Sequence, residues 1–186
     1  MSGKQKLYDT FSQLIENMNY ADITIKDFIK EAKVNRNTFY YHFDDMDGFL
    51  KEYLDDMIFF NVQKLIVTNK LSDGYNLMVD YVYSHRKAFL NILHNEKGTD
   101  VIDYILHTGF RMDVSKVLYD YERFLKISVT DEFIVYYAHN IADEYMRALK
   151  MIVYENTNPS MMKKVFQLFA DSISTMLVRV SKLNLN

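Results

Sequence analysis

Hydrogen-bonding side chains gather between residues 37 and 42 of this 186-residue sequence. Two apolar residues in the same segment, Phe39 and Phe43, are four positions apart and would hold a short helix against a core. Side chains that can donate or accept hydrogen bonds are then left on the outer edge of that helix: Asn37, Thr38, Tyr40, Tyr41 and His42. Such side chains suit base edges and phosphates, and a single helix fits the major groove of DNA.

Three short helices are expected to position this edge. Residues 5–18 carry apolar residues on one helical stripe: Leu7, Phe11, Leu14, Ile15 and Met18. Thr24 is a candidate N-cap for a second helix, with Asp27 three residues further on. A tight turn at Lys33-Val34 leads to Asn35, a candidate N-cap for the third helix. This order over residues 5–43 is a helix-turn-helix arrangement.

The segment from Ile23 to Phe43 resembles the DNA-binding signature of the TetR family, most closely in Thr38-Phe39-Tyr40-Tyr41-His42-Phe43. The resemblance covers roughly the first quarter of the chain. It implies a ligand-responsive transcriptional regulator, by default a repressor. Such a regulator binds a near-palindromic operator in double-stranded DNA as a homodimer.

The resemblance also implies roles for individual residues. Thr24 would bond a phosphate while capping its helix, and Lys26 would reach a phosphate or a guanine edge. The side chains at 37 and 38 would lie nearest the bases, and those at 40–42 would contact the DNA backbone or thymine methyl groups. The candidate DNA-binding residues are Thr24, Lys26, Asn35, Arg36, Asn37, Thr38, Tyr40, Tyr41 and His42.

The charge and turn residues of this segment depart from the family's pattern. Residues 1–46 contain six Lys and Arg against seven Asp and Glu, and Lys33 stands where the family often has glycine. The family usually has one or two lysines at the start of the fourth helix, where this chain has Asp44, Asp45 and Met46. Residues 44–56 together contain six acids and one lysine. Fewer phosphate contacts predict weaker non-specific binding. The acids motivate an alternative, a TetR-like co-regulator that acts by protein–protein contact without binding DNA directly.

Residues 49–186 are expected to form a helical ligand-sensing and dimerisation domain behind a DNA-binding domain at residues 1–48. Apolar periodicity and caps predict helices from Asp45 to about Val67, from about Ser72 to Leu93, as a broken pair over Thr99–Phe124, from Thr130 to about Tyr154, and from Asn158-Pro159 onward. The chain is therefore expected to be all-α with about nine helices. The domain boundary falls inside a helix, so the two parts should move together.

The last two predicted helices carry broad apolar stripes, more than a small protomer is expected to cover. Pairing them across a two-fold axis would make a four-helix bundle, and the resemblance implies the same interface. The candidate interface residues are Tyr145, Leu149, Leu168, Phe169, Ile173, Met176, Leu177 and Val180. The alternative is that both helices belong to the core of one protomer.

The residues that would line a ligand pocket are abundant: 15 tyrosines, 13 phenylalanines and 11 methionines suit a site that adapts to a small apolar or aromatic ligand. Polar groups among them would orient such a ligand. The candidate ligand-binding residues are His85, His107, Arg111, Tyr137 and Asn140. For the histidines, the alternative is an ordinary core or half-exposed position.

Several function classes lack their usual signatures. The chain has no cysteine, glycine-rich phosphate loop, His-Glu-x-x-His or nucleophile elbow, so no catalytic residue, metal or cofactor is predicted. His139 and Asp143, four residues apart, are expected to form a surface hydrogen-bonded pair. No apolar run would span a membrane and no signal peptide is recognisable, so a cytoplasmic protein is expected. A second alternative is a small-molecule-binding protein or enzyme without a regulatory role.

Overall fold

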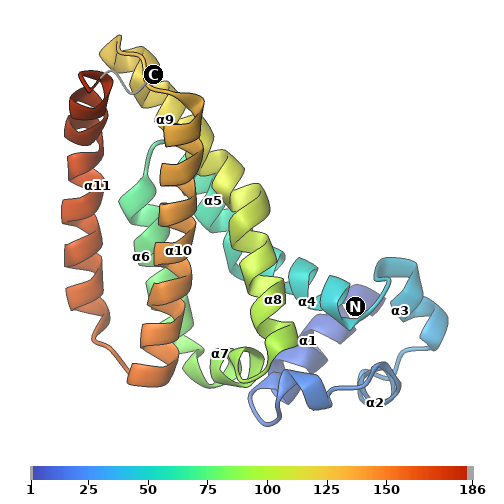
Figure 1. The fold of residues 1–186 in the computed structure, drawn as a ribbon. Helices are drawn as coiled ribbons and strands as arrows, with labels where there is room; N and C mark the ends of the chain where they lie inside the picture. Colours follow the sequence, from blue (N-terminus) through green and yellow to red (C-terminus); the bar gives the residue numbers. More distant parts are fainter. Residues whose placement is uncertain (1, 184–186) are drawn as a thin grey trace.

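The computed structural model describes residues 2–183, and all regular structure among them is helical (Figure 1). The elements in chain order are α1 (Gly3–Ile15), a 3-10 turn (Tyr20–Asp22), α2 (Ile25–Glu31), α3 (Arg36–His42), α4 (Met46–Leu54), a first π turn (Asp55–Phe59), α5 (Phe60–Val67), α6 (Leu71–Ser84), α7 (Arg86–Leu93), α8 (Glu96–Ile105), a second π turn (Leu106–Phe110), α9 (Arg111–Leu125), α10 (Asp131–Glu155) and α11 (Pro159–Ser181). The ends of the two predicted domains, residue 1 and residues 184–186, lie outside the described part.

Each π turn joins two helices without a break, so α4–α5 and α8–α9 are each one long helix. Counted in this way, residues 2–183 contain nine helices and no strand, which confirms the predicted fold class. None of these helices combines the length and apolar character that a membrane crossing requires.

The helices form two groups, which we call the head (α1–α4) and the body (α5–α11) (Figure 1). In the body α5 packs on α6 and α9, and α10 and α11 run antiparallel on the side away from α3. The groups meet where α4 packs on α8 and where α7 packs on α1. The long helix α4–α5 belongs to both, so a rotation of α4 moves the head relative to the body.

One aromatic ring of α4 lies at the centre of the head. Phe49 is fully buried, and its ring centroid lies 5.0 Å from that of Phe11 on α1, 4.9 Å from Phe28 on α2 and 5.0 Å from Phe43 at the end of α3. All three pairs meet edge to face, the arrangement that aromatic quadrupoles favour. The same ring therefore holds all three of the other head helices on the helix that enters the body.

The prediction of a single helix from Ser72 to Leu93 is wrong, because the chain leaves helical geometry at His85, with φ −112° and ψ 29°. The hydroxyl of Ser84 donates a hydrogen bond to the carbonyl of Asp80 at 2.8 Å. A serine that bonds back to the preceding turn in this way often bends a helix. The bend gives α7 its own direction and brings it against α1.

Two other helices have limits that differ from the prediction. The first helix ends at Ile15 and not at residue 18, and the side chain of Asn91 on α7 donates a hydrogen bond to the Ile15 carbonyl at 2.7 Å. The predicted broken pair over Thr99–Phe124 is one helix with a π turn, and it begins earlier because Asn95 caps the backbone N–H of Gly98. Both differences depend on partners that helical periodicity does not contain.

Removal of the central ring provides a test of this packing. Phe49→Ala should lower the free energy of unfolding by about 3–5 kcal/mol, because it leaves a cavity that the neighbouring aromatic rings cannot fill. Urea unfolding followed by circular dichroism measures the loss. Phe60→Ala, on the same continuous helix but 63% exposed, is the matched control and should change stability by less than about 0.5 kcal/mol. A loss below about 1 kcal/mol for Phe49→Ala would contradict a central role for this ring.

Candidate nucleic-acid interface

Two local features set the direction of α3. Lys33 makes the turn from α2 in the left-handed region, with φ 52°, a conformation that glycine adopts at less cost. The carboxamide oxygen of Asn35 then accepts a hydrogen bond from the backbone N–H of Thr38 at 2.7 Å, which caps the first turn of α3. The predicted turn and the predicted cap are both present.

The side chains of α3 divide sharply between core and surface. Phe39 is 0% and Phe43 4% exposed, whereas Tyr40 is 43% and Tyr41 84% exposed. Asn37 and His42 are exposed as well. The helix is therefore held by its two phenylalanines and presents hydrogen-bonding groups outward.

Thr38 departs from the role that the resemblance implied, because its side chain is turned toward α1. It is half-buried, and its hydroxyl donates to the Asn35 side chain at 3.0 Å. Its methyl group faces Gly3, where an added Cβ would lie only 2.4 Å from the Thr38 Cγ2 atom. Thr38 thus fastens α3 to α1, and Asn37 is the more accessible of the two.

The remaining candidates lie on the exposed side of α2 and α3. Arg36 lies along Tyr40, with its guanidinium 5.3 Å from the ring centroid and an N–H that donates to the tyrosine hydroxyl at 3.5 Å. Thr24 caps α2 by accepting from the backbone N–H of Asp27 at 3.2 Å. Lys26 is exposed and pairs with no acid among residues 2–183. Two cations, an amide and two phenols are therefore available on this side.

The acids of residues 44–56 have structural roles that their number alone does not reveal. Asp45 caps α4 by accepting from the backbone N–H of Gly48 at 2.7 Å. Asp47 accepts a hydrogen bond from the hydroxyl of Tyr20 at 2.6 Å. Burial, and then this hydrogen bond, raise the pKa of Tyr20. Both carboxylates are thereby tied to the fold of the head.

Two further acids hold α1 on α4. The ammonium group of Lys4 lies 2.5 Å from Glu52 and 2.9 Å from Asp56, and the hydroxyl of Tyr8 donates to Asp56 at 2.8 Å. Burial acts to raise the pKa of Asp56, but the hydrogen bonds from Lys4 and Tyr8 outweigh it and the pKa is lowered. We call Lys4, Tyr8, Glu52 and Asp56 the α1–α4 clasp. Nothing in the sequence indicated it, because its partners are 48 or 52 residues apart.

A negatively charged hollow lies beside the C-terminal end of α3. It has a volume of about 380 Å³ and is lined by His42, Phe43, Asp44, Gly48, Lys51, Glu52 and Asp55. The single lysine is turned toward α8, with its ammonium group 4.5 Å from the ring centroid of Tyr104. Burial raises the pKa of Asp55. A phosphate is disfavoured here, so the exposed N-terminal half of α3 is the better candidate for contact with DNA.

The predicted dimer interface divides into two groups, and half of it needs correction. Four of its residues lie inside the protomer, each at most 1% exposed: Tyr145, Leu149, Ile173 and Leu177. They cannot contact a partner without a rearrangement, because Phe166 of the same α11 stripe stacks on Tyr75 of α6 at 3.8 Å and holds this face inward. The other four stay accessible, Leu168 at 72% and Phe169, Met176 and Val180 partly.

The five predicted ligand-binding residues do not meet in one cavity. His107 lies 3.5 Å from Asp103 and 3.4 Å from Asp143, so the predicted pair of His139 with Asp143 is replaced by a contact between α10 and the second π turn. Arg111 and Asn140 donate to carbonyls of their own helices. Tyr137 stacks on Phe133 and Phe169 at 5.8 Å each, and burial raises its pKa to about 12.

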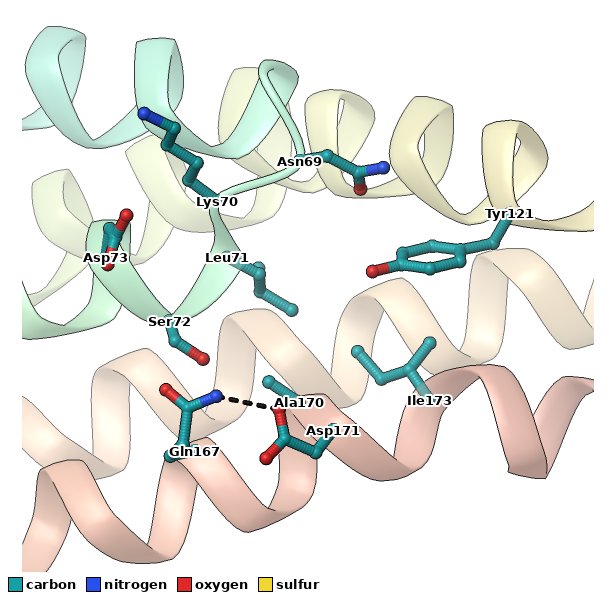
Figure 2. Close-up of a pocket in the computed structure, with 10 residues that line it drawn as sticks. All are labelled: Asn69, Lys70, Leu71, Ser72, Asp73, Tyr121, Gln167, Ala170, Asp171 and Ile173. Atoms are coloured by element: carbon teal, nitrogen blue, oxygen red, sulfur yellow. Dashed lines mark hydrogen bonds between the residues drawn. The ribbon is translucent and has the colours of Figure 1, made fainter. Parts of the chain in front are cut away.

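Of those five, His85 lines a hollow between α1, α4, α6 and α7. Within residues 2–183, no three His, Asp or Glu side chains gather in an arrangement that would hold a metal ion. A pocket lies where α9 and α11 meet the loop before α6 (Figure 2). Its volume is about 240 Å³. It is mostly polar, with Ser72, Asp73, Gln167 and Asp171 on its walls, and no sequence pattern indicated it.

A comparison with protein families identifies the head. Residues 7–53 match the model described as bacterial regulatory proteins, tetR family. The match covers the helix-turn-helix segment in which the sequence resemblance was found, and it confirms that resemblance. No curated protein sequence matches the chain.

Solved structures extend the likeness of fold to nearly the whole chain. The dihydroxyacetone kinase operon activator DhaS is 16% identical with a TM-score of 0.62, over 96% of this chain and 97% of that one. NemR of E. coli, in its reduced form, is 12% identical with a TM-score of 0.52, over 96% and 97%. The TetR family repressor AlkX from Dietzia sp. is 16% identical with a TM-score of 0.50, over 97% and 98%. The chain therefore has the fold of TetR-family transcriptional regulators.

The clasp predicts a pH dependence of stability. A carboxyl whose pKa is lowered by folding stabilises the fold above its unfolded pKa of about 4, and that stabilisation is lost as the pH falls through the folded-state pKa. Asp56→Asn should therefore lower the free energy of unfolding near pH 7, by up to about 1 kcal/mol because the carboxylate is half exposed. The difference from the parent should shrink toward zero as the pH falls below the unfolded value and through the lowered folded-state pKa.

Urea unfolding at several pH values measures this difference. Asp44→Asn is the matched control, since Asp44 is exposed and has no hydrogen bond or ion pair among the described residues. It should be close to neutral at every pH. An equal loss from Asp56→Asn at low and neutral pH would show that the charge of Asp56 does not support the clasp.

Proposed function

We propose that this protein is a cytoplasmic, ligand-responsive transcriptional regulator that binds operator DNA as a homodimer. The observation that carries the proposal is the division of α3, which buries Phe39 and Phe43 and leaves Asn37, Tyr40, Tyr41 and His42 outward. A seven-residue helix held in this way fits the major groove. Lys26 and Arg36 would contact phosphates at its edges, and Asn37 would read a base.

In this proposal residues 1–48 bind DNA, and residues 49–186 sense the ligand and dimerise. The dimer would form a four-helix bundle through the accessible face of α11, from Leu168 to Val180. A two-fold axis along that bundle would set the two copies of α3 about 34–36 Å apart, one turn of B-DNA. A ligand that prefers one spacing of the heads would change operator affinity by about 5- to 150-fold, equivalent to about 1–3 kcal/mol.

The direction of regulation has support in both senses from the structural neighbours, since DhaS is described as an activator and AlkX as a repressor. We propose repression relieved by ligand, which is the mode that the resemblance implies. The alternative of a co-regulator without DNA binding was motivated by the acids of residues 44–56. Four of these six acids cap or fasten helices, so their number is weaker support for that alternative.

Binding to DNA from upstream of the protein's own gene tests the proposal. Fluorescence anisotropy should show a complex whose affinity falls with salt. Lys26→Ala should weaken binding to all sequences and reduce the slope of log K against log salt by about 0.9. Asn37→Ala should cost about 1–3 kcal/mol on the preferred sequence and much less on unrelated DNA.

The matched controls for these variants lie in the body. Lys97→Ala and Lys150→Ala change exposed residues that are not on the head, and both should leave the affinity unchanged. If no complex forms at low salt, the co-regulator alternative is favoured. If a complex forms but Lys26→Ala and Asn37→Ala bind as the parent does, DNA binding through this face of the head is excluded.

Oligomeric state tests the dimer separately. Leu168 is 72% exposed on α11, and Leu168→Glu should place a charge in the proposed bundle and give a monomer in sedimentation velocity. Phe124→Glu, at a residue 83% exposed on α9, is the matched control and should leave the dimer intact. A parent protein that sediments as a monomer at micromolar concentration would refute the interface.

A further inference from the structure

A large hollow lies along α6, between that helix, the first π turn and α5. It has a volume of about 580 Å³, within the usual range of small-molecule sites. Its apolar lining comes from Met57, Ile58, Leu65, Leu77 and the ring of Tyr81. We call this hollow the α5–α6 groove.

Two lysines lie at one end of this groove, where the chain passes from α5 to α6. Lys64 near the end of α5 and Lys70 just before α6 both line it, and both are exposed. Neither forms an ion pair within residues 2–183. Figure 2 shows the ammonium group of Lys70 directed away from Tyr121 and Gln167, out of the polar pocket on its other side. Two uncompensated positive charges beside an apolar surface are complementary to an anionic group that carries an apolar chain.

A second hollow continues the apolar lining toward the head. It holds about 190 Å³ between α1, α4, α6 and α7, with mostly apolar walls that include Ile15, Leu54, Phe89 and Ile92. It shares two lining residues with the α5–α6 groove, Met57 and Tyr81. These two side chains are therefore a common wall between the groove and this second hollow, which we call the junction hollow.

We propose that the α5–α6 groove binds an amphipathic carboxylate. The carboxylate would lie between Lys64 and Lys70, and the apolar chain would lie over Met57 and Leu77 toward the junction hollow. This assignment deepens the proposed function by naming the class of its ligand and rests on that function for its regulatory effect. It replaces the scattered polar residues predicted from the sequence with a site that combines charge, apolar surface and volume.

The position of the groove explains how its occupant would reach the DNA-binding face. Met57 and Ile58 belong to the first π turn, where α4 passes into α5. A π turn holds one residue more than an α-helical turn and is frequently found at functional sites. A chain that presses on Met57 acts at the point where α4 can rotate relative to α5, and α4 carries Phe49 and the rest of the head.

Calorimetric titration with matched twelve-carbon amphiphiles, kept below their micelle concentrations, tests the site. Dodecanoate should bind at least about tenfold more tightly than dodecanol, a difference of about 1.4 kcal/mol, and dodecyltrimethylammonium should bind more weakly still. Lys64→Gln combined with Lys70→Gln should remove the preference for dodecanoate and leave dodecanol binding unchanged. Met57→Gln should weaken dodecanoate and dodecanol alike.

Lys97→Gln combined with Lys150→Gln removes two exposed lysines elsewhere on the body and is the matched control, with no expected change. The proposal is overturned if dodecanoate does not bind, if dodecanol binds as tightly, or if the Lys64/Lys70 variant keeps the full preference. Fluorescence anisotropy on promoter DNA distinguishes a failure of this ligand assignment from a failure of the proposed regulatory function. DNA binding without dodecanoate binding rejects only this ligand class, whereas dodecanoate binding that leaves DNA affinity unchanged rejects the regulatory function and keeps the site.

Discussion

The contact of Phe49 with the other helices of the head is the constraint on which the rest of this molecule depends. A short helix such as α3 has too few residues to be stable by itself and takes its direction from what it packs on. Here it packs through Phe39 and Phe43 on a ring that belongs to α4. Because α4 runs through the first π turn into α5, the orientation of the outward edge of α3 is set by a helix of the body.

The acids of residues 44–56 illustrate why a count of charges is a poor guide to a surface. From the sequence they oppose phosphate, yet Asp45 and Asp47 are engaged by a helix start and a tyrosine hydroxyl, and Glu52 and Asp56 by Lys4. The clasp also uses Lys4, so it removes a cation as well as two anions from contact with DNA. Recognition by this head must therefore depend more on hydrogen bonds from α3 than on general attraction to the DNA backbone.

The sequence predicted the features whose causes are local. A helix cap acts over three residues, and each of these predicted caps is present: Thr24, Asn35 and Asn158. The bend at His85 and both π turns were missed, because apolar periodicity continues through them. Apolar stripes also do not say which partner they meet. On α11, Ile173 and Leu168 look equivalent in sequence, but one faces α6 and α9 and the other faces solvent.

A regulator must favour one arrangement of its heads through a difference in ligand affinity between two states. The site for that ligand is then most effective where the two states differ. In this fold the helix α4–α5 packs on α8 and α9 along its length and contains a π turn next to the head–body junction. Helix α5 is fixed on the body, and Phe49 fixes α4 on the head. The π turn between them is therefore the place where the orientation of α4 relative to α5 can change. A groove that includes Met57 and Ile58 lies at that place, whereas no residue of the π turn lines the polar pocket beside α11.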